Sequence, residues 1–156
     1  MKLTTNFSVA ELTYSNTAVT NKLDNTPSSS ILKNLLDLAE NVLQPVRDNF
    51  AKSVIVNSGY RSTAVNSAAN GAKNSDHCFG KAADIEIVGV SNLELAEWII
   101  DNCEFKQVIL EFHNSDDNNS GWVHVSYDIN DNKKEVLSAV KVNNRTTYQR
   151  GLVLNT

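Results

Sequence analysis

Three side chains of the sequence, His77, Asp84 and His124, are of the types that together bind a zinc ion. His77 and Asp84 lie seven residues apart, and Gly80 between them lets the chain turn tightly enough for both side chains to reach one ion. Two imidazoles and one carboxylate occupy three positions of a tetrahedral zinc site and leave the fourth to water, which is the pattern of a catalytic site. This spacing predicts a metal centre with an open position.

The segment around His124 alternates between polar and apolar residues, as a strand with one buried face does. Val123 and Val125 point to one face of such a strand, so His124 points to the other face, together with Trp122. A zinc ion bound on that face would lower the pKa of a water from about 16 to about 7 and make it a nucleophile at neutral pH. The sequence therefore predicts a hydrolytic metal centre on the polar face of a strand.

Two motifs of the sequence resemble the M15 peptidases, the family of zinc D-Ala-D-Ala carboxypeptidases and endolysin peptidases. They are His77-x-x-Gly80-x-Ala82-x-Asp84 and Trp122-Val123-His124-Val125-Ser126. Three upstream segments extend the resemblance, which covers roughly residues 5 to 130 and is strongest to phage-encoded members. They are Phe7–Leu12, Leu43–Arg47 and Ser58–Ser62.

The resemblance implies a Hedgehog/DD-peptidase-like α+β fold, one Zn²⁺ ion and hydrolysis of peptide bonds in bacterial peptidoglycan. It assigns the metal to His77, Asp84 and His124. The bond cut would be of the D-Ala-D-Ala carboxypeptidase or the L-Ala-D-Glu endopeptidase type, two activities that share the metal site and differ in their pocket walls. The expected role is that of a phage enzyme of host lysis, or of a virion component, that acts on the cell wall.

The resemblance gives Arg61 the role of a cation near the scissile carbonyl, where a guanidinium stabilises an oxyanion or holds a substrate carboxylate. Many family members carry the general-base carboxylate three residues before the last His, but Gly121 occupies that position here. We therefore expect Glu111 to act as the base, because its strand runs into the loop that leads back to the last His. Asp116 or Asp117 in that loop is the alternative.

Simpler interpretations of these residues are also open. Glu111 could be a solvated strand residue, and Arg61 could only stabilise its turn. We expect His113 to be exposed at the start of a polar loop, and Cys78 to be a free buried thiol and not a fourth ligand. For the whole chain, the alternatives are a non-catalytic zinc module of a virion or wall-binding protein on the same fold, which Gly121 suggests, and a metal-free structural domain.

Composition limits the class of protein. The 156 residues are 41% hydrophobic and 21% charged, which is typical of one compact domain, here residues 1–156. The net charge of −4 and the pI of 5.3 argue against binding to nucleic acid. The sequence shows neither a signal-peptide core nor a run of about 20 apolar residues, so we expect cytoplasmic synthesis without a signal peptide and no membrane partner. With two cysteines, we expect reduced thiols, and we expect a monomer.

Periodicity and capping patterns predict helices first and a group of strands after them. One expected helix begins at residue 8. Three more cover residues 30–50, 62–70 and 91–101, and Pro45 should interrupt the first of these three. The expected strands are 53–57, which should be buried, 84–88, 107–112, 122–127 and an edge strand at 136–142. Residues 15–27 and 113–121 are expected to be loops, the second joining antiparallel neighbours. This order favours an α+β domain with helices packed on one face of a mostly antiparallel sheet.

Overall fold

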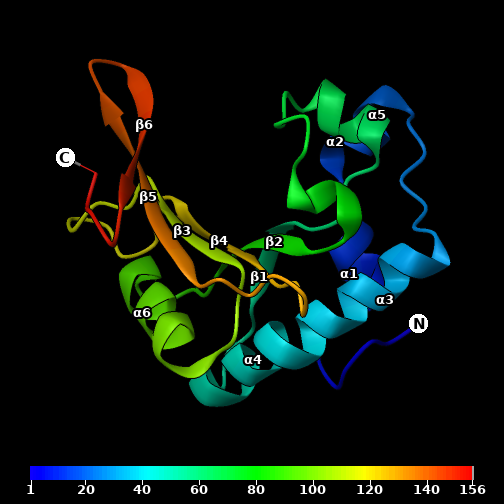
Figure 1. The fold of residues 1–156 in the computed structure, drawn as a ribbon, viewed down its shortest axis with the longest axis horizontal. Coiled ribbons are helices and arrows are strands. Elements are labelled where there is room, and N and C mark those ends of the chain that lie inside the picture. The colour runs from blue at the N-terminus through cyan, green and yellow to red at the C-terminus, as the bar shows by residue number, and fades with distance from the viewer. Residues whose placement is uncertain (156) are drawn as a thin grey trace.

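The computed structural model describes residues 1–155, which form a six-stranded sheet flanked by helices (Figure 1). The strands in chain order are β1 (Ile55–Ser58), β2 (Ala82–Glu86), β3 (Gln107–Glu111), β4 (Trp122–Ser126), β5 (Glu135–Val142) and β6 (Arg145–Arg150). They lie in the order β1-β2-β4-β3-β5-β6, and each neighbouring pair is antiparallel except β3 and β5, which are parallel. The predicted α+β class with a mostly antiparallel sheet is confirmed.

Two short helices open the chain, and a serine side chain caps each of them. α1 (Val9–Thr13) starts where the Ser8 hydroxyl accepts a hydrogen bond from the Glu11 N–H at 3.2 Å, as the capping-box pattern predicts. α2 (Asn16–Asn21) lies within residues 15–27, so the prediction that this segment is a loop is wrong. A helix of six residues is too short to show a clear apolar periodicity, which is why the sequence pattern does not indicate it.

One long helical segment follows, and Pro45 changes its geometry instead of ending it. The segment consists of α3 (Ser29–Leu38), the π-helical turn η1 (Ala39–Leu43) and α4 (Gln44–Phe50). Pro45 lacks the N–H that an α-helix would use, and the wider π turn directly before α4 accommodates that loss. The apolar residues that recur at three- and four-residue steps face the core, with 0% exposure at Leu35, Leu38, Val42 and Val46, and Ile31 at the start of the segment is partly buried.

The hydrophobic core lies between one face of the sheet and the longer helices. This face carries six fully buried strand residues, which are Ala83, Ile85, Val108, Leu110, Val123 and Val125. The α3–α4 segment and α6 (Asn92–Asn102) cover it (Figure 1). Burial of each large aliphatic side chain contributes roughly 1.5–3 kcal/mol, so this face holds the strands and helices together. The opposite face of the central strands is left for polar side chains.

α5 (Thr63–Ala68) and the 3₁₀ turn η2 (Asp76–Phe79) connect β1 to β2. In Figure 1, α5 lies on the other side of the sheet from α4 and α6, and the β5–β6 hairpin extends to that same side. These two parts of the chain therefore flank the sheet face that the longer helices leave uncovered. None of the helices within residues 1–155 has the length and apolar character that crossing a membrane requires.

Two strands occupy positions that differ from those the sequence predicts. The strand predicted as buried, β1, is an edge strand, and its Ile55 is 38% exposed. The strand predicted as an edge, β5, is internal, because β6 pairs with its outer side. The sequence pattern does not indicate β6, since its residues Arg-Thr-Thr-Tyr-Gln-Arg show no apolar alternation. The one sequence feature that indicates this hairpin is its turn, because Asn143 and Asn144 both take the positive φ that a tight hairpin needs.

Candidate metal centre and active site

Asp84 and His124 lie directly opposite each other on the antiparallel strands β2 and β4. Directly opposed residues point to the same face of a sheet, here the face away from the core. Asp84 Oδ1 lies 3.0 Å from His124 Nδ1, a nitrogen that either donates a hydrogen bond to the carboxylate or, without its proton, can bind an ion. Val123 and Val125 point to the core side, as the alternation predicts. The register of two strands thus brings one carboxylate and one imidazole together.

His77 reaches the same carboxylate from η2, a turn that a serine cap begins and Gly80 ends. His77 Nδ1 lies 2.7 Å from the Gly59 carbonyl oxygen, which can only accept, so Nδ1 carries the proton. Nε2 is then the free nitrogen, and it lies 3.4 Å from Asp84 Oδ1. Gly80 has a φ of +70°, and a Cβ there would press on Ile31, so the turn requires glycine.

The donor set and its spacing fit a zinc ion. One ligand atom from each of His77, Asp84 and His124 lies within 4.8 Å of the other two. In a tetrahedral zinc site with bonds of about 2.0–2.1 Å, neighbouring ligand atoms are roughly 3.3 Å apart. The two imidazole nitrogens lie 3.0 and 3.4 Å from the Asp84 oxygen, close to that spacing. The Gly59 carbonyl orients the His77 ring in the way that outer hydrogen-bond partners orient metal-binding histidines.

Asp84 is ionised in this arrangement. Burial raises the pKa of its carboxyl, but the imidazoles of His124 and His77 beside it outweigh burial and hold that pKa well below its ordinary value. A carboxylate must be ionised to bind a metal, so no proton has to leave Asp84 near neutral pH. The side chains of His77 and His124 are 4% and 12% exposed, which leaves them accessible from the cavity alone.

Glu111 lies on β3 opposite Trp122 of β4, and so on the same face as His124 two residues further along β4. Burial and the negative charge of Asp84 raise the pKa of Glu111 to about 7. His124, the Trp122 side chain and Arg61 lower this pKa, but by less. A carboxyl group with such a pKa can accept and return a proton at neutral pH, as a general base must.

Gly121 stands three residues before His124, where the resemblance leads one to expect a carboxylate. Its φ is +67°, and a Cβ at this position would overlap the carbonyl oxygen of Glu111. Any side chain at residue 121 would therefore push β3 away from β4. The backbone requires glycine here, and it is β3 that supplies a carboxylate to this face.

Arg61 lines the same cavity from the segment after β1. Its backbone N–H donates to the His77 carbonyl oxygen at 3.1 Å, which ties this segment to η2. Arg61 Nε is buried and has no hydrogen-bond partner within residues 1–155. The preceding Tyr60 is buried and packs in the core, outside the lining of the cavity.

These side chains surround a cavity of about 480 Å³, a size common for small-ligand sites. Its lining extends from Arg61 and the α5–η2 connection across the sheet to Tyr148 on β6. Sequence reasoning missed Gln107, Ile109 and Tyr148 as lining residues. The alternation that places Glu111 on this face could have found the first two, whereas the polar pattern of β6 contains no comparable signal for Tyr148.

The loop of residues 113–121 brings no carboxylate to the cavity. Asp116 and Asp117, the alternatives to Glu111, are exposed, and neither of them lines the cavity. The Asn92 side chain donates to carbonyls at the end of the loop, and the Asn119 side chain donates to carbonyls after β2. These four hydrogen bonds hold the loop against the connection between β2 and α6, so of the three acidic candidates only Glu111 faces the cavity.

The prediction that His113 is exposed is wrong, because its exposed fraction is 2%. His113 Nδ1 lies 3.1 Å from the Ser120 carbonyl oxygen, so the ring closes the loop from inside. Burial of this kind depends on how the loop folds back and leaves no local pattern in the sequence. Neither His113 nor Cys78 belongs to the potential metal cluster found within residues 1–155. Cys78 is a free, half-buried thiol whose pKa is raised by burial.

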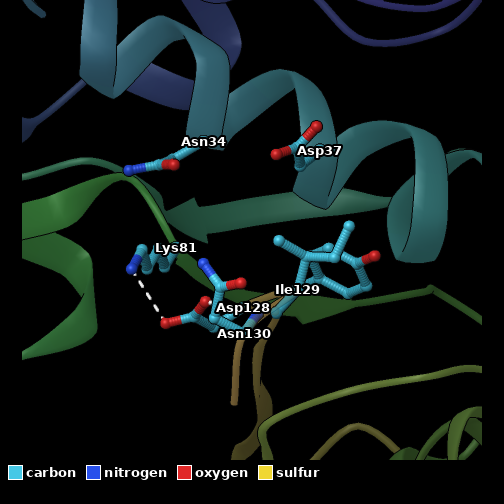
Figure 2. Close-up of a pocket in the computed structure, with 7 residues that line it drawn as sticks. Asn34, Asp37, Lys81, Asp128, Ile129 and Asn130 are labelled. Carbon is cyan, nitrogen blue, oxygen red and sulfur yellow. Dashed lines mark hydrogen bonds and ion pairs between the residues drawn. The ribbon is translucent and has the colours of Figure 1, made fainter. Parts of the chain in front are cut away.

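A second, smaller pocket lies elsewhere, between α3 and the connection from β4 to β5 (Figure 2). Its volume is about 70 Å³, and Asn34 and Asp37 of α3 face Lys81 and Asp128 across it. Lys81 Nζ lies 2.8 Å from Asp128 Oδ2, and this hydrogen bond lowers the pKa of Asp128. The ion pair ties the start of β2 to the end of β4, so this pocket is a structural junction beside the metal centre's strands.

Comparison with known proteins bears on the reaction class. A search of curated proteins gives no match. The sequence model of the family described as Peptidase M15 matches residues 5–126, which is most of the chain. This span contains η2, β2, β3 and β4, and thus His77, Asp84, Glu111 and His124, but it ends before β5. Since every element that carries a candidate metal ligand lies within the match, we conclude that the chain belongs to the Peptidase M15 family, as its motifs predict.

Proposed function

We propose that this protein is a zinc-dependent peptidase that hydrolyses peptide bonds in the stem peptides of bacterial peptidoglycan. The observation that carries the proposal is the convergence of His77, Asp84 and His124 in one cavity, with Glu111 beside them. Membership of the Peptidase M15 family supports the reaction class. The peptidoglycan substrate and a phage role in cell-wall lysis rest on the resemblance of the two motifs to endolysin peptidases.

The geometry suggests a division of roles among these side chains. His77 Nε2, Asp84 and His124 would hold the zinc ion, which when bound supplies a Lewis acid that polarises the scissile carbonyl and acidifies a water. Glu111 accepts a proton from the attacking water and returns it to the leaving amine. Arg61 stabilises the developing oxyanion or holds a substrate carboxylate, and its buried, unpartnered Nε supports that role.

Gly121 no longer supports the alternative of a non-catalytic zinc module. Gly121 suggested this alternative because a carboxylate is missing there. The backbone at Gly121 admits no side chain, so the glycine reflects close packing of β3 on β4 and does not argue against catalysis. Glu111→Ala separates the two functions, since it should abolish cleavage by a peptidase and leave the binding function of a zinc module intact.

Digestion of purified peptidoglycan tests the proposal. Zinc-loaded protein should release new amines from the wall, and a chelator should stop the release until zinc is restored. Peptidoglycan of several chemotypes should be tested, because the shape of the pocket decides which stem peptides the protein accepts. A folded protein with one zinc per chain that cleaves none of them would refute the proposed activity.

Mass spectrometry of the soluble muropeptides identifies the bond. Loss of one terminal D-Ala would indicate a carboxypeptidase, and separation of L-Ala from D-Glu would indicate an endopeptidase. Both reactions would use the same metal centre. The product identified therefore reports on which bond the cavity walls select and not on the zinc ligands.

A further inference from the structure

The β5–β6 hairpin lies outside the span that the family model matches, yet it forms part of the cavity wall. The match ends at residue 126, whereas β5 and β6 together cover residues 135 to 150. Tyr148 of β6 nevertheless lines the cavity that contains Glu111 and the candidate metal ligands. The part of the chain that matches the family therefore does not include this wall of the cavity.

The sheet register places Tyr148 in line with Glu111. Trp122 of β4 pairs with Glu111 of β3, Glu111 pairs with Ala139 of β5, and Ala139 pairs with Tyr148 of β6. Directly paired residues share a face, so their side chains form one row across the sheet on the cavity side. Ala139 contributes only a methyl group, so no bulky side chain of this row stands between Tyr148 and Glu111. Burial and the negative charge of Glu111 raise the pKa of Tyr148, as this proximity requires.

Tyr148 is 57% exposed although it lines a cavity. Its ring is not part of the hydrophobic core, and its hydroxyl makes no side-chain hydrogen bond within residues 1–155. A tyrosine can bury roughly 150–250 Å² against a partner and offers a polar group at its tip. Tyrosines in such positions are frequent hot spots of binding sites. The side chain therefore has both free surface and a free hydroxyl for a ligand.

The opposite wall of the cavity consists of Arg61, residues 69–72 and residues 74–76. Between the two walls the strands lie in the order β2, β4, β3, β5 and β6. A ligand that extends from one wall to the other must therefore pass over Asp84, His124 and Glu111 in turn. A peptide bond held above these groups has one side of its chain against each wall.

Positive charge accompanies Tyr148 on the hairpin. Arg150 follows Tyr148 by two residues along β6, and Lys141 pairs with Thr146, so alternation puts both cations on the cavity-side face. The hairpin, residues 135–150, contains three Lys and Arg residues and one acidic residue, Glu135, although the chain as a whole carries a net charge of −4. This local excess favours an anionic ligand on the hairpin side.

We propose that Tyr148 is a specificity-determining residue whose ring and hydroxyl contact an anionic part of the stem peptide on the β6 side of the scissile bond. This inference rests on the proposed function, because it takes the ligand of the cavity to be a peptide. Stem peptides carry free carboxylates, which match the cations beside Tyr148. Contact at this wall sets which peptide can place its bond over the metal centre.

Steady-state kinetics on soluble muropeptides tests the role of Tyr148. Tyr148→Ala should raise KM about tenfold and change kcat by less than about threefold, because it removes binding that is the same in the ground and transition states. Thr147→Ala is the matched control, since Thr147 pairs with Val140 on the other face of the hairpin and should leave both constants unchanged. Tyr148→Phe keeps the ring and measures the hydroxyl alone.

Calorimetry with zinc-loaded Glu111→Gln protein measures the same contact without turnover. Adding Tyr148→Ala should weaken muropeptide binding about tenfold, and adding Thr147→Ala should not. If Tyr148→Ala lowers the melting temperature, Tyr148→Leu, which keeps a bulky side chain in the strand, takes its place. Equal KM and Kd values for the Tyr148 and Thr147 variants, or a fall in kcat alone, would overturn the inference. A wild-type protein that cleaves no muropeptide would instead count against the proposed function.

Discussion

The cavity joins two regions that differ in almost every physical respect: the floor, formed by His77, Asp84, His124 and Glu111, and the β5–β6 hairpin. The imidazoles of the floor are 4% and 12% exposed and are hydrogen-bonded, whereas Tyr148 of the hairpin is 57% exposed. The strands of the floor are paired on both sides, whereas β6 is an edge strand. Groups that hold an ion need fixed positions, and groups that select a ligand need free surface. If both proposals above hold, chemistry and selection are located on different strands.

The floor also contains unfavourable features that the hairpin lacks. The pKa of Glu111 is raised to about 7 because its charge is buried, and Phe112 directly after it has a φ of +56°. A left-handed conformation costs a residue with a side chain roughly 1–2 kcal/mol. The hairpin has positive φ values too, but they fall on Asn143 and Asn144, which tolerate them. A desolvated carboxyl group thus lies where we propose that the reaction takes place.

Removal of a metal ligand should have the largest effect. Asp84→Ala leaves two imidazoles for the ion, so we expect the zinc content to fall from one per chain to background and cleavage to fall roughly a thousandfold or more. Elemental analysis and amine release measure the two losses. Asp128→Ala, which removes a paired carboxylate outside the cavity, should keep its zinc. Full zinc content in Asp84→Ala would break the assignment of the floor.

Removal of the proposed base should have the next largest effect and should leave the metal in place. Glu111→Gln should lower kcat by about 10²- to 10⁴-fold at unchanged zinc content. Wild-type activity should decline as the pH falls through the pKa of Glu111, which is about 7 in the metal-free site and lower beside a bound cation. Glu97→Gln, on the exposed side of α6, is the control. An unchanged rate in Glu111→Gln would transfer the role to another group.

Substitution of one glycine beside each region compares how strongly the two regions constrain the backbone. Gly121→Ala must displace the Glu111 carbonyl, so we expect the free energy of unfolding to fall by roughly 2–4 kcal/mol. Gly151, directly after β6, has a φ of +81° but open space where a Cβ would lie, so Gly151→Ala should cost only about 1 kcal/mol. Urea unfolding gives both values. Equal losses would mean that conformational strain alone, and not contact between β3 and β4, requires glycine at 121.

The smallest expected effect is on the pH dependence of stability. Folding raises the pKa of Glu111 from 4.5 to about 7. The stabilising contribution of its protonated form to the free energy of unfolding is therefore fully present below pH 4.5 and is lost as the pH rises through 7. Metal-free Glu111→Gln lacks this loss and should be more stable than the wild type by about 2 kcal/mol at pH 8, but not at pH 4. Unfolding at both pH values measures it. If the two proteins behave alike, Glu111 is a solvated strand residue.

Local patterns in the sequence predicted much of the frame around the floor. The serine of a capping box begins α1, Pro45 marks the π turn, and alternation puts His124 and Val123 on opposite faces of β4. These features depend on residues a few positions apart, which is why a sequence pattern records them. The order of strands depends on contacts between distant segments, and there the predictions for β1, β5 and β6 were wrong or absent.

The candidate site shows the same division. Residue types and spacing singled out His77, Asp84 and His124, and the alternation of β3 singled out Glu111. The choice between Glu111 and Asp116 or Asp117 required the hydrogen bonds that hold the loop. Tyr148 could not be found in the sequence, because its place beside Glu111 arises from two successive strand pairings.

Local sequence patterns were enough to predict which side chains could bind a metal, where most of the helices begin and which face of each central strand is polar. Three other features became visible only in the folded chain: Gly121 admits no side chain, His113 is buried and the hairpin closes one side of the cavity. The physical reason is distance along the chain. Alternation and capping act over two to four residues, whereas strand order, burial and the pKa of Glu111 depend on groups tens of residues away that meet only after folding.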